Sequence, residues 1–316
     1  MKIKILPLFL VIPLTACQQT PALESKVFCF DTMVELKLFE GDETDLKEIK
    51  NIFNYYDKIS DNYKARDITN VYTINQTNND IEIDSKLYDL LKASFGVSSD
   101  GATYFNPLCG SLAKKWKESL KNQQILPENE KNAEILKINS SSVLFKENNI
   151  IQRLGEAEID LGGIAKGYTL DMAKNYLESR DISKYLLNAG SSSTMLGEKN
   201  SKDGLFSVGL RDVNNAYLKL KNCVVSTSGT SVQGVIIDGV TYSHIINPTT
   251  GSAINNYDAV IVISEKGYYG DALSTSMMMN TIDEIKTIEQ EHNVKTIVVK
   301  DKKIVYQNSE IEVYHS

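Results

Sequence analysis

Residues 156–180 read EAEIDLGGIAKGYTLDMAKNYLESR. Apolar and acidic residues alternate up to Ile159, a Gly162-Gly163 pair follows, and helical spacing then continues. The pattern predicts a strand ending at Ile159, a tight turn, and a helix that begins near Gly163. The first N–H groups of such a helix are free to bind an anion, and Lys166 adds positive charge. The glycine spacing matches neither a Walker loop nor GxGxxG, so a purely structural role for the glycines stays open.

The rest of the chain mixes helical and strand patterns without a regular strand–helix–strand order. Strand patterns occur at 27–39 and from 184 onward, and 294–308 is typical of a closing hairpin. The polar segment 121–148 predicts a surface excursion. We therefore expect an α+β fold with mostly antiparallel sheets and flanking helices over 27–316, in one compact unit or two lobes. Besides the helix that begins near Gly163, the predicted helices are 41–60, 84–99, 111–120, 271–280 and 282–292.

The N-terminus, MKIKILPLFLVIPLTAC, has the pattern of a secretory signal. Its apolar run is shorter than the roughly 20 residues that a membrane-spanning helix needs. Leu-Thr-Ala-Cys resembles a bacterial lipobox, which implies two acyl chains on Cys17, enough for stable anchoring. We expect a signal peptide at 1–16, a lipidated Cys17 with a tether over 17–26, and a location on the extracytoplasmic face of the cell membrane. A plain cleaved signal peptide is the alternative.

Composition narrows the classes of function. The 316 residues carry a formal net charge of −7 and no Lys/Arg-rich run, which argues against nucleic-acid binding. Besides Cys17 the chain has only Cys29, Cys109 and Cys223, without a CxxC pair. This odd number argues against a disulfide framework or a cysteine metal site, although one bridge stays open.

Two further motifs carry chemistry. His244, one of three histidines, stands before a tight turn in TYSHIINPTTG, a place where rigid scaffolds often carry site residues. Asp271 and Thr275 are four residues apart in YYGDALSTSMMM, hence on one face of a helix. A carboxylate and a hydroxyl in that arrangement suit a hard cation such as Mg²⁺. A helix-capping Asp with a buried Thr explains the same spacing.

In this order the motifs resemble the ApbE family, the FAD:protein FMN transferases. FDTMVELKLF (30–39) and GATYFNPLCGSLAKKW (101–116) resemble two further family segments, so the likeness covers nearly the whole mature chain. The long family motif is almost intact. The matching stretches are DLGGIAKGYTLD (160–171), Ser228-Gly229, HIINPTTG (244–251) and DALSTSMM (271–278).

The resemblance implies a Mg²⁺-dependent enzyme whose substrate is FAD. A Thr or Ser hydroxyl of an extracytoplasmic acceptor protein, in a Ser/Thr-Gly-Ala-Ser/Thr-like context, would attack the FMN-side phosphorus, and AMP would leave. Such phosphoryl transfer depends on positioning and charge neutralisation. Two alternatives stay open: a Mg²⁺-dependent FAD pyrophosphatase that releases FMN and AMP, and a lipid-anchored FAD-binding protein without turnover.

The resemblance also implies roles for single residues. Asp271 and Thr275 would be side-chain metal ligands, and Gly163 would supply a backbone carbonyl. His244 would act as general base or orienting group for the incoming hydroxyl. The residues implied to contact FAD are Thr32 or Met33, Tyr104, Phe105, Asn106, Asp160, Lys166 and Ile245.

Several positions depart from the family pattern. Asn106 and Asn247 stand where Asp is usual, and Asp31 stands where a small residue is usual. Each asparagine removes a negative charge near the expected pyrophosphate, so hydrogen bonding could survive there without acid–base chemistry. NAGSSS (188–193) lacks the glycine that usually follows NAG, and RDITNVY (66–72) matches its family segment poorly.

Overall fold

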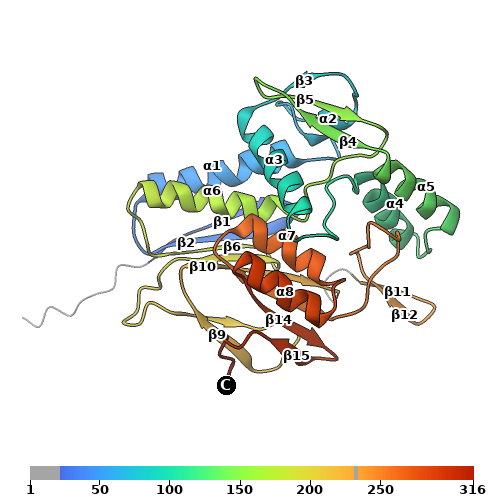
Figure 1. The fold of residues 1–316 in the computed structure, drawn as a ribbon. Coiled ribbons are helices and arrows are strands. Elements are labelled where there is room, and N and C mark those ends of the chain that lie inside the picture. The colour runs from blue at the N-terminus through green and yellow to red at the C-terminus, as the bar shows by residue number, and fades with distance from the viewer. Residues whose placement is uncertain (1–21, 231–233) are drawn as a thin grey trace, which may run out of the picture.

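A computed structural model describes residues 22–230 and 234–316. Its centre is an eight-stranded sheet in which all neighbouring strands are antiparallel (Figure 1). The strand order is β1 (Leu23–Cys29), β2 (Thr32–Leu38), β6 (Tyr185–Ala189), β7 (Ser193–Leu196), β10 (Cys223–Gly229), β13 (Ala259–Ser264), β14 (Lys295–Lys300) and β15 (Lys303–Gln307).

Three smaller antiparallel sheets complete the β structure among the described residues. The expected α+β fold with mostly antiparallel sheets is confirmed, as is the closing hairpin of β14 and β15. The small sheets are β3 (Ile81–Glu82) with β5 (Ile150–Leu154) and β4 (Ser142–Phe145), β16 (Tyr314–His315) with β9 (Ala216–Leu220) and β8 (Phe206–Gly209), and β11 (Val235–Ile237) with β12 (Val240–Tyr242).

Four helices cover one face of the large sheet: α1 (Glu43–Ser60), α6 (Ala165–Ser179), α7 (Gly267–Met277) and α8 (Ile282–His292). In Figure 1, α1 and α6 lie side by side, with α7 and α8 farther along the sheet. Leu36 of β2, Phe53 of α1 and Leu170 of α6 share one buried cluster. Because strand side chains alternate, the neighbouring residues of the sheet face the β8–β9–β16 layer in a separate cluster.

The remaining helices, α2 (Val71–Asn75), α3 (Ser85–Ser99), α4 (Gly110–Lys121) and α5 (Glu128–Asn139), pack with the β3–β5–β4 sheet. Their core includes Leu91 of α3 and Trp116 of α4, and it continues into Leu273 of α7. Thus α7 is buried by both parts of the molecule, and the N-termini of α6 and α7 lie where the two parts meet (Figure 1).

The expected strand at Ile159 is wrong, because residues 156–161 form no strand and belong to none of the sheets. The Asn75 side chain takes the place of a strand partner. Its Nδ2 donates to the Ile159 carbonyl at 2.9 Å, and its Oδ1 accepts the Ile159 N–H at 2.8 Å. A side-chain amide therefore satisfies the backbone that the pattern assigned to a sheet.

Other boundaries also differ from the sequence expectation. Segment 27–39 is a hairpin of two strands, because Phe30 and Asp31 adopt positive φ of 54° and 55° between β1 and β2. β1 begins at Leu23, inside the expected tether 17–26. Segment 121–148 contains α5 and β4.

The expectations about the membrane concern the N-terminus of the chain. No helix within 22–230 and 234–316 has the length and apolar character that crossing a membrane requires. The expected signal peptide and Cys17 lie outside the described residues. The cysteines at 29, 109 and 223 are free thiols.

Candidate active site

A cavity of about 470 Å³ opens where the N-terminal end of α6, the helix α7 and several loops meet. Met33 is the one expected site residue that does not line it. Met33 is 47% exposed and lies opposite Phe28 on the outer face of the β1–β2 hairpin, because strand alternation turns it away from Thr32. The expected residues that line the cavity are Thr32, Tyr104, Phe105, Asn106, Asp160, Gly163, Lys166, His244, Ile245, Asp271 and Thr275.

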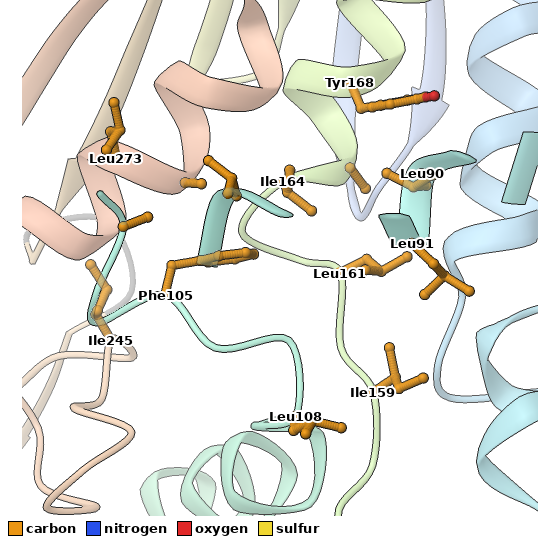
Figure 2. Packing of buried hydrophobic residues seen from close by; sticks show 14 of the residues in the cluster. Leu90, Leu91, Phe105, Leu108, Ile159, Leu161, Ile164, Tyr168, Ile245 and Leu273 are labelled. Atoms are coloured by element: carbon orange, nitrogen blue, oxygen red, sulfur yellow. The ribbon is translucent and has the colours of Figure 1, made fainter. Parts of the chain in front are cut away.

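The loop before α6 is fixed by its apolar side chains. Ile159, Leu161 and Ile164 are buried, and Figure 2 shows them packed into the core with Phe105 nearby. Asp160, between two of them, lines the cavity instead. Its carboxylate accepts the Gly162 N–H at 2.6 Å and an amide N–H of Asn62 at 2.9 Å. The apolar anchors thus hold the polar side of this loop toward the cavity.

Asp271 is the most enclosed charged group of the site, at 7% exposure. Its Oδ1 accepts the hydroxyls of Ser193 at 2.6 Å and Ser226 at 2.7 Å, and its Oδ2 accepts the Gly167 N–H at 2.7 Å. Burial raises the pKa of this carboxyl, while the cationic Lys166 and the three donors act in the opposite direction. Three of its approximately four acceptor positions are used, which leaves room for one further ligand.

α6 and α7 cross in backbone contact at two glycines. A Cβ on Gly167 would lie 2.1 Å from the Gly267 carbonyl oxygen, and a Cβ on Gly267 would lie 2.5 Å from the Gly167 carbonyl oxygen. Only glycine permits this approach. It brings the first turn of α6, with Lys166, beside Asp271 of α7.

Oxygen atoms dominate the region next to Asp271. Thr275 Oγ1 lies 3.1 Å from Ser228 Oγ and donates to the Asp271 carbonyl at 3.1 Å, and Ser228 Oγ lies 2.9 Å from Ser274 Oγ. A Cβ placed on Gly163 would lie 3.8 Å from Thr275 Oγ1, so the α6 turn faces α7 closely. A carboxylate with hydroxyl and backbone oxygens fits Mg²⁺, which prefers hard ligands and retains several waters. No cluster of three His, Cys, Asp or Glu side chains suited to a metal occurs in the described part of the chain.

His244 is exposed at the mouth of the cavity. The surrounding protein lowers the pKa of its imidazole, and the positive charges of Lys166 and Lys117 lower it further. The backbone beside it is held by the chain's single tryptophan, because Trp116 Nε1 donates to the Ser243 carbonyl at 2.9 Å. A neutral imidazole is thereby presented to whatever enters the cavity.

Comparison with known proteins agrees with this geometry. The sequence profile of the ApbE family matches residues 30–298. The chain belongs to the ApbE family. It is 25% identical over 284 residues to a protein of Klebsiella pneumoniae named FAD:protein FMN transferase, and the match covers 85% of this chain and 87% of that one.

Two solved ApbE structures share the fold. The ApbE protein of Thermotoga maritima superposes with a TM-score of 0.76 at 24% identity, covering 93% of this chain and 97% of its own. The apo form of the flavinyl transferase ApbE of Pseudomonas stutzeri gives a TM-score of 0.75 at 19% identity, covering 91% and 95%.

The two asparagines that replace the usual ApbE aspartates both support turns. Asn106 Oδ1 accepts the Leu108 N–H at 2.9 Å, and Asn247 Oδ1 accepts the Thr249 N–H at 2.8 Å. An amide oxygen and a carboxylate oxygen can both accept such bonds, so these replacements are compatible with the same turns. Asn106 lines the cavity, whereas Asn247 does not.

Several residues that build this ApbE site were not predicted from the sequence. Ser193 and Ser226 hold Asp271, and Asn62 holds Asp160. Arg211 lines the cavity and donates to the Ser191 carbonyl at 2.8 Å. Ser193 lies in NAGSSS (188–193), and the missing glycine after NAG was the only feature of the sequence that drew attention to this segment. The others are isolated polar residues that acquire a role only through tertiary contact.

Proposed function

We propose that this chain transfers FMN from FAD to a Thr or Ser hydroxyl of an acceptor protein and releases AMP. One observation carries the proposal: the α6 N-terminus with Lys166, the Asp271–Thr275 pair and His244 all line a single cavity. The helix start with Lys166 can bind an anion, the oxygens of Asp271 and Thr275 can bind a cation, and His244 can act as a base. Phosphoryl transfer uses these three kinds of group together. The name of the Klebsiella relative supports the same activity.

The cavity suits a dinucleotide bound at its pyrophosphate. Its volume falls within the range of ordinary small-molecule sites, roughly 300–1,000 Å³. At the start of α6 the N–H groups of Gly162, Ala165 and Gly167 already have acceptors within the protein. The Lys166 ammonium and the positive end of the α6 dipole would therefore bind the phosphates. Tyr104, Phe105 and Ile245 line the same cavity and offer apolar surface to the rings of FAD.

Asp271 and Thr275 would hold Mg²⁺ together with the Gly163 carbonyl. When bound, the cation supplies positive charge to the pyrophosphate oxygens and the leaving phosphate. The protein contributes the fixed position of these ligands. Ser193, Ser226 and the Gly167 N–H prevent the Asp271 carboxylate from rotating.

His244 would accept the proton of the attacking hydroxyl. Its exposure where it lines the cavity supports this role, because an acceptor side chain would arrive from outside. Because its pKa is lowered, the ring remains neutral and able to accept a proton at neutral pH. Water can reach the same place, which favours FAD pyrophosphatase activity as the second candidate function.

We further propose that Cys17 carries the lipid anchor and that the protein works on the extracytoplasmic face of the membrane. Only residues 18–22 separate Cys17 from β1. An extended chain of that length reaches about 20 Å at most, so the folded part would stay close to the membrane. Acceptor proteins on the same surface would then be the accessible partners.

The test of function is intact-mass spectrometry of an acceptor domain with a Ser/Thr-Gly-Ala-Ser/Thr sequence after incubation with the protein, FAD and Mg²⁺. We expect one added FMN per acceptor and an equal amount of AMP. His244→Ala should bind FAD but lose the transfer. AMP and free FMN without an adduct would support the pyrophosphatase instead. Intact FAD without an adduct would contradict both activities.

The lowered pKa of His244 predicts how the rate of FMN transfer depends on pH. A base with a lowered pKa stays unprotonated to lower pH, so transfer should lose activity on the acid side only below the ordinary histidine value of 6.5. Lys117→Gln removes a positive charge that lowers this pKa, so it should move the acid limb to higher pH. The measurement is kcat/KM against pH. Lys121→Gln, on the same helix, is the control, and an equal shift in both variants would contradict the assignment.

A further inference from the structure

α6 and α7 cap each other's first turns. Neither helix has a side-chain cap of its own, since Ile164 and Lys266 occupy the N-cap positions. Asp171 of α6 accepts the N–H of Gly267 at 2.7 Å and that of Tyr268 at 3.0 Å, both in the first turn of α7. In return, Asp271 of α7 accepts the Gly167 N–H in the first turn of α6.

The exchange has a matching geometry on the two sides. In each helix the aspartate stands four residues after the glycine at the crossing point, Gly167 with Asp171 and Gly267 with Asp271. The two helices therefore cap each other: Asp171 of α6 caps α7, and Asp271 of α7 caps α6. Helix N-termini favour negative charge, so both contacts are attractive in the ionised state.

The two aspartates differ in what else they reach. Asp271 lines the cavity, whereas Asp171 does not and is 9% exposed. Burial raises the pKa of Asp171 to about 6, and the two backbone N–H bonds act against this rise. Asp171 therefore lies outside the cavity lining, and its two hydrogen bonds go to the start of the helix that carries Asp271 and Thr275.

We propose that Asp171 is a positioning residue for the cation site. Its carboxylate fixes the first turn of α7 against α6 and so sets the separation between the Gly163 turn and the Asp271–Thr275 pair. This inference rests on the cation site of the proposed function. Supporting residues of this kind typically change metal affinity by about 10–100-fold when they are replaced.

The experiment measures cation binding without using transfer. The thermal midpoint of the full chain is followed as MgCl₂ is raised, since a ligand that binds only the folded state stabilises it according to its concentration and Kd. FAD binding is measured separately by flavin fluorescence in EDTA. For Asp171→Asn we expect the apparent Kd for Mg²⁺ to rise about tenfold, with FAD binding in EDTA unchanged.

Asp45→Asn is the matched control. Asp45 is also a buried carboxylate, but it belongs to α1, where it accepts hydrogen bonds from Tyr176 of α6 and from Arg180 just after α6. It lies away from the cavity. We expect Asp45→Asn to lower the thermal midpoint without changing the apparent Kd for Mg²⁺. An unchanged Kd in Asp171→Asn, or an equal rise in Asp45→Asn, would overturn the proposal.

A second variant covers the case in which Asp171→Asn does not fold. Asp171→Glu keeps the charge and both oxygens but lengthens the side chain, which displaces α7 from α6, so the same rise in Kd is expected and an unchanged Kd overturns the proposal. Wild-type protein that binds Mg²⁺ but transfers no FMN would refute the proposed function alone. Wild-type protein that Mg²⁺ does not stabilise would remove the cation site and this inference with it.

Discussion

Asp271→Asn is expected to reduce FMN transfer by about 10²–10³-fold or more, the loss usual for removing one group that stabilises transition-state charge. The amide keeps the size of the side chain, so the Ser193 and Ser226 contacts can persist. It lacks the negative charge that would hold the cation beside the pyrophosphate. EDTA should produce the same loss in the wild type. The measurement is the initial rate of AMP release and of the FMN adduct on the acceptor.

Asp45→Asn serves as the control here too, because it removes a buried charge that does not line the cavity. It should retain transfer at near the wild-type rate. If Asp271→Asn transfers FMN as fast as Asp45→Asn, the metal ligand has been misassigned. A wild-type rate that EDTA does not change would exclude the Mg²⁺ dependence.

Gly167→Ala is expected to destabilise the fold by about 3 kcal/mol or more, the upper part of the range for forcing an extra carbon into a packed interior. The new Cβ would lie 2.1 Å from the Gly267 carbonyl oxygen and 2.8 Å from the Tyr268 nitrogen, both backbone atoms that cannot rotate away. Relief requires α6 and α7 to separate, which lengthens the Gly167–Asp271 hydrogen bond. Urea denaturation measures the loss of stability.

Gly96→Ala provides the opposite result for the same substitution. Gly96 lies inside α3, and a Cβ there has no atom within 4 Å. Alanine in a helix interior is better than glycine by roughly 0.5–1 kcal/mol, so this variant should be more stable than the wild type. A Gly167→Ala protein with an unchanged urea midpoint would show that the helix crossing tolerates more space than the structure gives it.

Local sequence signals accounted for most of the helices. α1 begins after Asp42, which forms a reciprocal capping box with Asp45, and α8 begins after Thr281 in the same way with Glu284. Side-chain spacing and caps act within a few residues, so the sequence alone reveals them. α5 escaped prediction because only Glu134 and Ile138 of its residues are buried, which leaves almost no apolar stripe to detect.

The chemistry of the site was also largely visible in the sequence. Asp271 and Thr275 needed only helical spacing to share a face, and His244 needed only its place before a turn. Strand alternation decides that Thr32 lines the cavity and Met33 does not. The sequence did not show which of these two neighbours faces the cavity, because its pattern predicts one strand across the turn at Phe30 and Asp31.

The sequence by itself determined which groups this protein brings to its cavity: a helix start with Lys166, an oxygen pair at Asp271 and Thr275, and one histidine at a turn. Tertiary structure alone decided how they are held. The Asn75 amide replaces a strand partner at Ile159, two glycines let α6 and α7 touch, and Asp171 caps a helix that begins 96 residues later. Such contacts join residues far apart in the chain, so no periodicity or local propensity records them. They exist only once the core has placed both backbones.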